Sequence, residues 1–285
     1  MELTFLGTSA DTAFPLAFCD CQNCCDARAS GGKSLRRRSS VMIDDDLVID
    51  LGPDSVLAGL QFGRPFSRVR HILQTHPHSD HFDPSHLLSR ASEYGSVNTH
   101  DVQIFASELS LKRMNLMARA LGFGHDLHSV AARELLGVMV RVVSPLQTFR
   151  VGRYDATAFE SNHDDDVGSL IFSLEGDGSR LLYATDTDSL PERTWAGLSA
   201  KKLTFDVVVL DHTYGFGADG GGHLNAVRFG EHLERMRLEG VISSTTRVFA
   251  THLSHEGHPA HGPLSDLARG LGYEIPWDGM TIRVG

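Results

Sequence analysis

A dense run of histidines constrains this chain more than any other feature of its sequence. Residues 75–81 read Thr-His-Pro-His-Ser-Asp-His, which places three imidazoles and a carboxylate side by side, directly after a strand-like run. A regular strand or helix cannot turn all four groups to one side, whereas a loop at the end of a strand can direct them to one point. Nitrogen and carboxylate oxygen donors together suit zinc, manganese or iron rather than calcium.

Four later strand-like runs also end in a histidine or an aspartate. In order along the chain they lead to His163, to Asp186, to Asp211 with His212, and to His252. In a layered α/β protein the strand ends gather along one rim, and side chains there can converge on one site. The sequence therefore predicts that these residues meet the histidine-rich loop around a shared metal centre.

All of the cysteines lie within residues 19–25. Thiols this close along the chain make poor disulfide partners. Cys19, Cys21 and Cys24 have the spacing Cys-x-Cys-x-x-Cys, which offers three thiolates to one tetrahedral ion and needs a fourth ligand, most simply a histidine. Cys25 is an additional thiol that competes with Cys24, and the spacing favours Cys24. Redox-active thiols and inert surface cysteines are the alternative interpretations.

Length and charge limit the classes of function. At 285 residues with 41% hydrophobic content, the chain can bury a sizeable core, and we expect one domain over residues 1–285. The net charge of −10 argues against broad binding to nucleic acid or anionic lipid. No secretory signal or long apolar run is visible, so we expect a soluble, cytoplasmic protein without a membrane partner. The arginines at 36–38 are interpreted as a solvated face, with a phosphate-facing role as the alternative.

The motif His-x-His-x-Asp-His resembles the signature of the metallo-β-lactamase-fold hydrolases. Together with the cysteine motif and a late Thr251-His252-x-x-His255, it makes the chain most similar to the phosphoribosyl 1,2-cyclic phosphate phosphodiesterases of the carbon-phosphorus lyase pathway. The resemblance extends from Gly7-Thr8 to the run at 277–280. It implies an α/β fold of four layers (an αββα sandwich), two divalent metals in the active site, zinc or manganese, a separate structural zinc, and a homodimer.

The resemblance also assigns the ligands. It implies that one active-site metal is held by His76, His78 and His163. It implies that the other is held by Asp80, His81 and His252, with Asp186 bridging the two. The structural zinc is assigned to Cys19, Cys21, Cys24 and His255.

Further roles follow from the same resemblance. His223 matches the general acid, Asp80 is counted as catalytic as well as a ligand, and Asp50 is expected to hydrogen-bond the ligands from behind. His212 follows a buried-looking strand and is interpreted as a supporting or core histidine rather than a ligand. The late histidines 258 and 261 either contact substrate phosphate or lie on the surface.

The implied activity is hydrolysis of a small cyclic phosphate ester by a metal-bound hydroxide. One alternative is an RNA-processing phosphodiesterase of the same fold, which the acidic balance of the chain disfavours. Another is an accessory protein of pyrroloquinoline quinone biosynthesis, which the complete set of ligands disfavours. A metal-dependent scaffold without activity and a β-lactamase are weaker hypotheses. The expected partner is a small-molecule phosphodiester, and nucleic acid is not expected.

Overall fold

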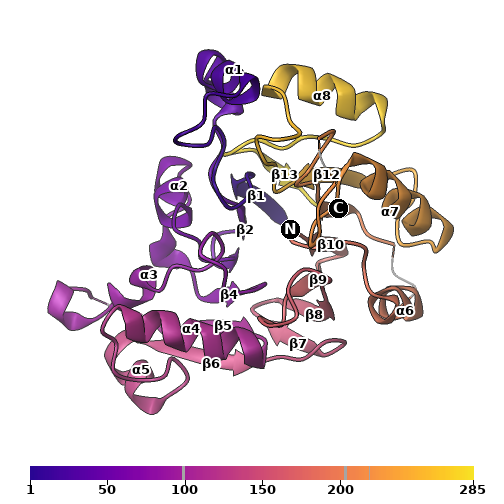
Figure 1. Cartoon of the computed structure of the whole chain (residues 1–285). Helices are drawn as coiled ribbons and strands as arrows, with labels where there is room; N and C mark the ends of the chain where they lie inside the picture. The colour runs from indigo at the N-terminus through magenta and orange to yellow at the C-terminus, as the bar shows by residue number, and fades with distance from the viewer. Residues whose placement is uncertain (98–99, 202–203, 218) are drawn as a thin grey trace.

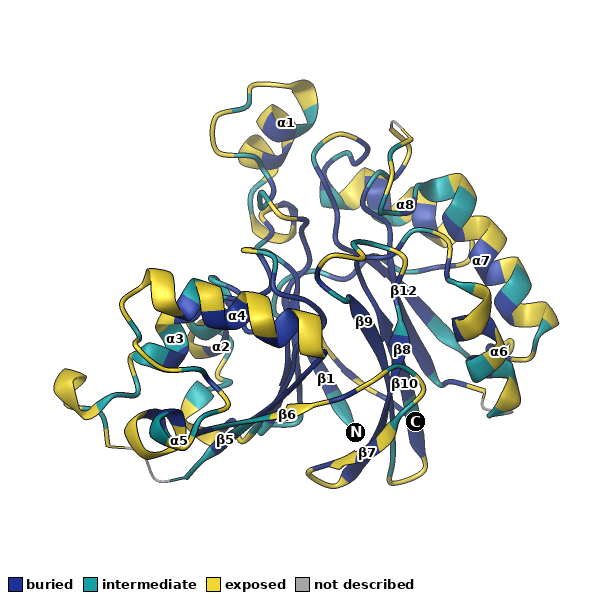
Figure 2. Ribbon diagram, turned by 60° about the horizontal axis from the view of Figure 1, so that its bottom comes forward, coloured by how far each residue is buried: buried dark blue, intermediate teal, exposed yellow. Residues whose placement is uncertain are grey.

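Two β-sheets pack face to face, and helices cover their outer faces (Figures 1 and 2). The structure is a computed structural model that describes residues 1–97, 100–201, 204–217 and 219–285. The first half of the chain, joined by one strand from the C-terminus, builds one sheet with its helices, and the second half builds the other. This arrangement is the predicted αββα sandwich of the metallo-β-lactamase fold.

The first sheet has seven strands in the order β13-β1-β2-β3-β4-β5-β6. Strands β1 to β3 are antiparallel neighbours, and β3 to β6 run parallel. Strand β1 pairs with β2 on one side and with β13 from the C-terminus on the other. The bounds are β1 (Glu2–Gly7), β2 (Ser40–Ile43), β3 (Leu47–Ile49), β4 (His71–Leu73), β5 (Val102–Ala106), β6 (Val138–Val142) and β13 (Thr281–Arg283).

The second sheet has six strands in the order β12-β11-β10-β9-β8-β7. Strands β7 to β10 form an antiparallel meander, and β10, β11 and β12 are parallel. Its continuous apolar strands, such as β11, are buried on both faces, as parallel strands usually are. The bounds are β7 (Thr148–Val151), β8 (Tyr154–Glu160), β9 (Leu170–Gly176), β10 (Ser179–Ala184), β11 (Val207–Asp211) and β12 (Arg247–Thr251).

The helices fall into two groups, one on each outer face, and α1 stands apart above the sandwich (Figure 2). The helices of the first half are α1 (Gln22–Ser30), α2 (Ser55–Gln61), α3 (Ser85–Leu88), α4 (Glu108–Ala120) and α5 (Val130–Leu136). Those of the second half are α6 (Glu192–Ala200), α7 (Ala226–Leu238) and α8 (His261–Gly270). Short 3-10 turns are η1 (Gly32–Ser34), η2 (Phe66–Arg68) and η3 (Ser92–Tyr94).

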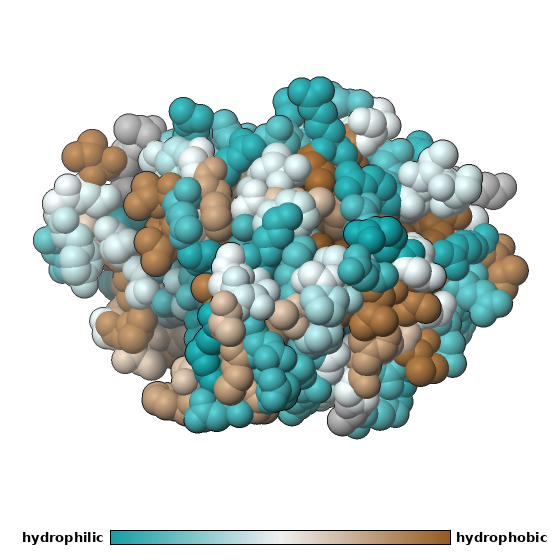
Figure 3. Space-filling model, turned by 90° about the horizontal axis from the view of Figure 1, so that it is seen from above, coloured by the Kyte–Doolittle hydropathy of each residue, from teal (hydrophilic) through white to brown (hydrophobic). Residues whose placement is uncertain are grey.

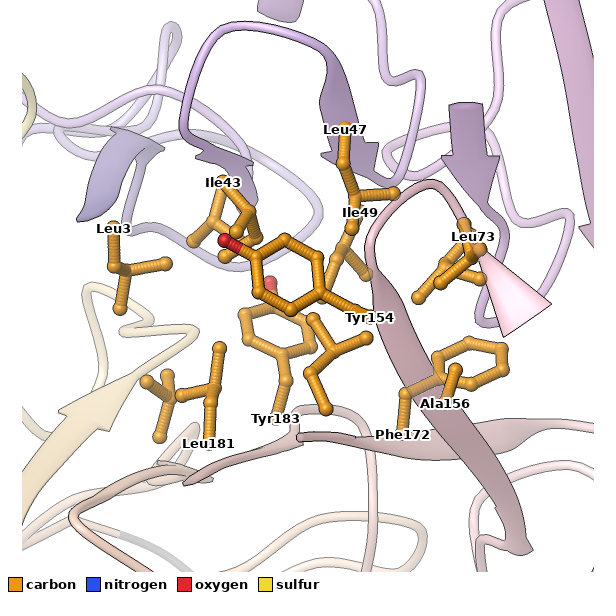
Figure 4. Packing of buried hydrophobic residues seen from close by; sticks show 14 of the residues in the cluster. Leu3, Ile43, Leu47, Ile49, Leu73, Tyr154, Ala156, Phe172, Leu181 and Tyr183 are labelled. Carbon is orange, nitrogen blue, oxygen red and sulfur yellow. The ribbon is translucent and has the colours of Figure 1, made fainter. Parts of the chain in front are cut away.

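The central core lies between the sheets (Figure 4). There, side chains of β1 to β4 meet those of β8 to β10, with Ile43 and Ile49 facing Tyr154, Phe172 and Tyr183. Each sheet also packs against its own helices through one further apolar cluster. Burying one such side chain fully contributes about 1.5–3 kcal/mol, so the three clusters together hold the strand ends in fixed positions.

The buried face of α4 is formed by residues at the helical spacing i, i+3, i+7. It includes Leu111, Met114 and Ala118. Met117 is partly buried and packs against the same apolar cluster. Leu109, on the opposite side of the helix, is 44% exposed, and Leu121, just beyond its end, is 56% exposed.

The surface is mixed in character. On the face seen in Figure 3, hydrophobic side chains lie in small groups between hydrophilic ones. Such scattered apolar groups are ordinary on protein surfaces. Among the described residues, none of the helices combines the length and the apolar character that crossing a bilayer requires.

Candidate metal centre and active site

The predicted active-site ligands lie in loops that follow the carboxyl ends of strands. The loop after β4 carries residues 76–81, and the loops after β8, β10 and β12 carry His163, Asp186 and His252. Because β3 and β4 run parallel in one sheet, and β10 to β12 run parallel in the other, their ends meet at one edge of the sandwich. The structure thus brings together residues from both sheets.

Three imidazoles form the first group of possible ligands. His78 Nδ1 lies 3.0 Å from His76 Nε2 and 3.2 Å from His163 Nε2. His163 Nδ1 donates to the carbonyl of Gly222 at 2.9 Å, which leaves its Nε2 as the lone-pair nitrogen. Burial lowers the pKa of His76 well below its ordinary value and also lowers that of His163, so both rings are held in the neutral form that binds metals.

The second group is fully buried and contains Asp80, His81, Asp186 and His252. His81 Nε2 lies 3.0 Å from Asp80 Oδ2 and 3.1 Å from Asp186 Oδ2. His252 Nε2 lies 3.1 Å from Asp186 Oδ1. That same Asp186 oxygen is 3.9 Å from His163 Nε2 of the first group. The carboxylate of Asp186 therefore stands between the two groups.

The polar atoms of this second group fit a bound cation. His81 Nε2 and Asp186 Oδ2 are buried and have no hydrogen-bond partner among the described residues. Burial opposes charge on His81, but Asp186, Asp80 and Asp50 together raise its pKa well above the ordinary value. The closely spaced carboxylates therefore favour a positive charge at this point. A divalent cation would supply that charge and would displace the proton of His81 on binding.

Three of these loop residues have left-handed backbone conformations although none is glycine. The φ angles are 68° for Asp50, 54° for Asp186 and 59° for His252. Such conformations cost about 1–3 kcal/mol each and occur most often at functional sites. Here each one lies directly after a strand, where it turns the side chain away from the strand direction and into the site.

Asp50 supports the metal groups from behind, as the sequence predicts. Its carboxylate is buried and accepts hydrogen bonds from the backbone N–H and hydroxyl of Thr75, from Gln74 Nε2, and from His81 Nδ1 at 2.7 Å. The last of these bonds fixes the His81 ring with its Nε2 toward Asp186. Ligating histidines are commonly oriented in this way.

Asp211 plays the corresponding part in the second sheet. It accepts hydrogen bonds from the backbone N–H groups of Asp186, Thr213 and Leu224, and from His223 Nδ1 at 2.9 Å. Burial lowers the pKa of His223, but the adjacent Asp211 carboxylate raises it to about 9. His223 is thus held in its protonated form beside the ligands, with its side chain 16% exposed.

Thr213 joins this network to the ligands. Its hydroxyl lies 2.7 Å from His252 Nδ1, 3.0 Å from His223 Nδ1 and 3.0 Å from Asp211. The strand-end pattern placed Asp211 near the site without a specific role, whereas Thr213 and Asp164, which contacts His78 Nε2 at 3.1 Å, were missed. The sequence Asp-x-Thr at a strand end, with alternate residues on one face, is the signal that would have found Thr213.

The cysteine site brings together the four residues that the sequence names. Cys19 Sγ and Cys21 Sγ lie 3.6 and 3.4 Å from His255 Nδ1, and Cys24 completes the group. The hydrogen bond with His255 lowers the pKa of Cys21 to about 6, which favours the thiolate that metals bind. Cys25 instead points to the carbonyl of Asp20, outside the group.

Three other histidines stand away from the ligand groups. His212 and His258 are fully buried, and His212 Nδ1 lies 3.0 Å from His258 Nε2. The other ring nitrogen of His212 contacts the Tyr273 hydroxyl, and that of His258 contacts the Ser254 carbonyl. His212 is thus a core histidine, as expected, and His258 neither lies on the surface nor reaches a substrate. His261 is partly buried against Arg36.

The arginine run at 36–38 is not the solvated face that the sequence predicts. Arg36 is 3% exposed and donates to Thr8 Oγ1 and to the Pro276 carbonyl. Arg37 and Arg38 pair with Asp278 and Asp54 respectively. The run ties the N-terminal loops to the C-terminal segment, because partners from both ends of the chain surround it.

With the geometry established, the family can be stated. A sequence model described as the beta-lactamase superfamily domain matches residues 46–253, well over half of the chain. The chain therefore belongs to the beta-lactamase superfamily. A search of curated protein sequences finds no match.

Among solved structures, the chain is similar to a diphosphatase from the PhnP family, with a TM-score of 0.71 at 20% identity, over 99% of this chain and 96% of that one. It is similar to Zn²⁺-bound PqqB from Methylobacterium extorquens, with a TM-score of 0.71 at 16% identity over 100% of both chains. Human tRNase Z, short form, gives a TM-score of 0.65 at 18% identity over 100% of both chains. These likenesses confirm the predicted metallo-β-lactamase fold.

Proposed function

We propose that this chain is a metal-dependent phosphodiesterase that hydrolyses a small cyclic phosphate ester. The observation that carries the proposal is the pair of ligand groups that share Asp186, directly in front of a histidine that is held protonated. A hydrolase for phosphodiesters needs both features, because the attacking water must be activated and the departing alkoxide must receive a proton.

The residues fit two divalent cations, one at His76, His78 and His163 and the other at Asp80, His81 and His252, with Asp186 between them. When bound, such cations lower the pKa of a water molecule and neutralise charge on the phosphoryl oxygens. The donors are the nitrogen and carboxylate oxygen atoms that zinc and manganese both accept. A structural zinc at the cysteine site is part of the same proposal.

The chain itself supplies the proton for the leaving group. His223 lies next to the ligands, and its ring stacks on that of His252 with centroids 5.1 Å apart. Asp211 holds the Nδ1 side of His223, so the Nε2 side remains available to a substrate oxygen. General acid catalysis of this kind contributes roughly 10²- to 10⁴-fold in rate.

Substitution of His223 by alanine tests this role. We expect His223→Ala to keep its active-site metals and to lose about 10²- to 10⁴-fold in kcat on alkyl phosphodiesters. The loss should be much smaller on nitrophenyl esters, because nitrophenolate leaves without a proton. Equal losses on the two kinds of ester would remove His223 from the role of acid.

The proposed activity is tested by metal analysis of the purified protein together with a panel of substrates. The panel contains bis(4-nitrophenyl) phosphate, cyclic nucleotides, ribosyl cyclic phosphates and a short RNA. We expect three ions per chain and turnover of the small esters, with the RNA untouched. A preference for the ribosyl ring would support the substrate that the sequence resemblance implies, and failure on every phosphodiester by fully metal-loaded protein would refute the proposal.

A further inference from the structure

Two hollows open beside the metal centre and share four lining residues, His78, His163, Tyr214 and His223. One has a volume of about 430 Å³ and extends past His252 to the loop at 254–256. The other has a volume of about 530 Å³ and extends past Asn162 to the loop at 164–166. We call the two together the cleft. Whatever part of a substrate extends beyond the reacting phosphate must lie in it.

The lining of the cleft is acidic at both ends. Outside the ligand groups it carries Asp11 and Glu256 in one hollow, and Asp164, Asp165 and Asp166 in the other. Among the described residues, no lysine or arginine lines either hollow. Asp11, Glu256, Asp165 and Asp166 are exposed, so their charges face whatever enters the cleft.

Two arginines whose partners lie in or next to the cleft lining are already engaged. Arg38 binds the carboxylate of Asp54 at 2.9 Å and the backbone carbonyl of Asp11 at 2.9 Å. Arg228 binds Asp188 at 2.6 Å and also contacts Asp219 at 3.3 Å. Reaching a substrate anion would require either side chain to leave its carboxylate, so neither offers a ready site for a second phosphate.

One tyrosine, Tyr214, lines both hollows within this negative field. Tyr214 is partly buried, and its pKa is raised first by burial and then by the charges of Glu256, Asp211 and Asp11. An aromatic face beside carboxylates is a favourable environment for an ammonium group, since both attract positive charge. A substrate cation can therefore approach Tyr214 without displacing any ion pair.

The charges of the metal centre itself are matched by a single phosphodiester. Two divalent cations held by Asp80 and Asp186 leave an excess of about two positive charges. One phosphodiester anion together with an attacking hydroxide offsets that excess. A second phosphate on the substrate would face the acidic ends of the cleft instead. The carboxylates there would repel it, because both carry negative charge.

We propose that the cleft selects phosphodiesters whose far end carries a positive charge, as in an ester of an amino alcohol, over phosphodiesters that carry a second phosphate. This inference rests on the proposed phosphodiesterase function and narrows its substrate class. It departs from the phosphoribosyl substrate that the sequence resemblance implies, because that ester carries a second phosphate.

The test uses three 4-nitrophenyl phosphodiesters with the same leaving group and different second alcohols. The second group is ethyl, 2-(trimethylammonio)ethyl or 2-phosphoethyl, and kcat/KM is measured with the metal-loaded protein. We expect the cationic ester to exceed the ethyl ester by about tenfold and the phosphorylated ester to fall about tenfold below it. Raising the salt concentration should compress these ratios. Equal rates on all three esters, or a preference for the phosphorylated one, would overturn the inference.

Binding provides a readout that does not depend on turnover. Calorimetry with the three corresponding non-hydrolysable phosphonates should give the same order of affinities. If the phosphonates bind in that order but no ester is hydrolysed, the charge selection stands and the proposed activity fails. If the esters are hydrolysed at equal rates, the activity stands and the charge selection fails. Absence of any difference in binding would also overturn it.

Paired substitutions locate the selecting charges. Asp11→Asn with Glu256→Gln neutralises one end of the cleft, and Asp165→Asn with Asp166→Asn neutralises the other. We expect the ratio of the cationic to the phosphorylated ester to fall about tenfold in at least one pair. The matched control, Glu134→Gln with Glu234→Gln, removes two exposed charges from α5 and α7 outside the cleft lining and should keep the ratio. An equal ratio in all of these variants would contradict the proposal.

Discussion

The two sheets each contribute a buried aspartate that holds an imidazole, and the imidazoles have different tasks. Asp50, after β3, holds His81, whose side chain is fully buried. Asp211, at the end of β11, holds His223, whose side chain reaches the cleft. Both carboxylates also accept a threonine hydroxyl and backbone N–H groups, from Thr75 in one case and Thr213 in the other.

The difference lies in what the second nitrogen of each ring meets. His81 Nε2 faces the carboxylates of Asp80 and Asp186, where a metal can replace its proton. Among the carboxylates of the described residues, His223 has only Asp211 within hydrogen-bonding distance, and that charge raises the pKa of His223 to about 9. Burial raises the pKa of Asp50, whereas for Asp211 the charge of His223 outweighs burial and lowers the pKa. In the proposed function, the same local arrangement therefore gives a metal ligand in one sheet and a general acid in the other.

The largest effect is expected where the two halves meet. Asp186→Ala removes the one carboxylate among the described residues that lies within 4 Å of all three of His163, His81 and His252. We expect the affinity for active-site metal to fall by more than about 100-fold, beyond the range usual for supporting residues, and the rate to fall with it. Metal content and kcat are measured together, and normal stoichiometry in this variant would refute a bridging role.

A smaller but more selective effect is expected from Asp211→Asn. Loss of the charge beside His223 lowers the pKa of that histidine, so less of it is protonated at neutral pH. We expect a loss of about 10²-fold or more in kcat on alkyl esters and a smaller loss on nitrophenyl esters. The zinc proposed for the cysteine site should stay bound, because the hydrogen bonds of Asp211 do not involve Cys19, Cys21 or Cys24. An equal loss of kcat on alkyl and nitrophenyl esters would contradict the distinction between Asp211 and Asp50.

Asp50→Asn should act on the metals rather than on the leaving group. An amide in this place no longer fixes the His81 ring as strongly, and supporting contacts of this kind are worth about 10- to 100-fold in metal affinity. Titration with zinc in a competing chelator measures the change. With excess metal, the ratio of rates on alkyl and nitrophenyl esters should match that of the unmodified protein, in contrast to Asp211→Asn.

The threonines give the smallest expected change. Thr75→Val and Thr213→Val each leave buried acceptors with one donor fewer, which costs about 1–3 kcal/mol of unfolding free energy. Thr213→Val should also reduce activity more than Thr75→Val, because its hydroxyl contacts both His252 and His223. Chemical denaturation and kcat on one alkyl ester would check both statements. Equal activities would show that the second contact is not used.

Much of the site was predictable because each ligand follows a strand that the sequence marks clearly. Thr213 and the supporting role of Asp211 were missed for a physical reason. Residues alternate sides along an extended chain, so Asp211 and Thr213 face the ligands while His212 between them packs against Phe229 and Tyr273. His212 therefore packs in the core, whereas Asp211 and Thr213 contact the histidines of the site.

The acidic lining and the buried arginine could not be predicted in the same way. Asp11, Glu256 and the aspartates at 164–166 lie in loops without periodicity, and nothing local indicates which loops share a cleft. Arg36 looked like one member of a charged run, yet its partners come from residues 8, 261 and 276. Only the packing of distant segments reveals such environments.

The short loop between β12 and α8 carries His252 of the active site and His255 of the cysteine site. Oxidation of the exposed Cys21 thiol would break its contact with His255. The loop that positions His252 beside Asp186 would then be less rigidly held. Thiol damage outside the active-site ligand groups would thus reduce the proposed activity through the backbone of this loop.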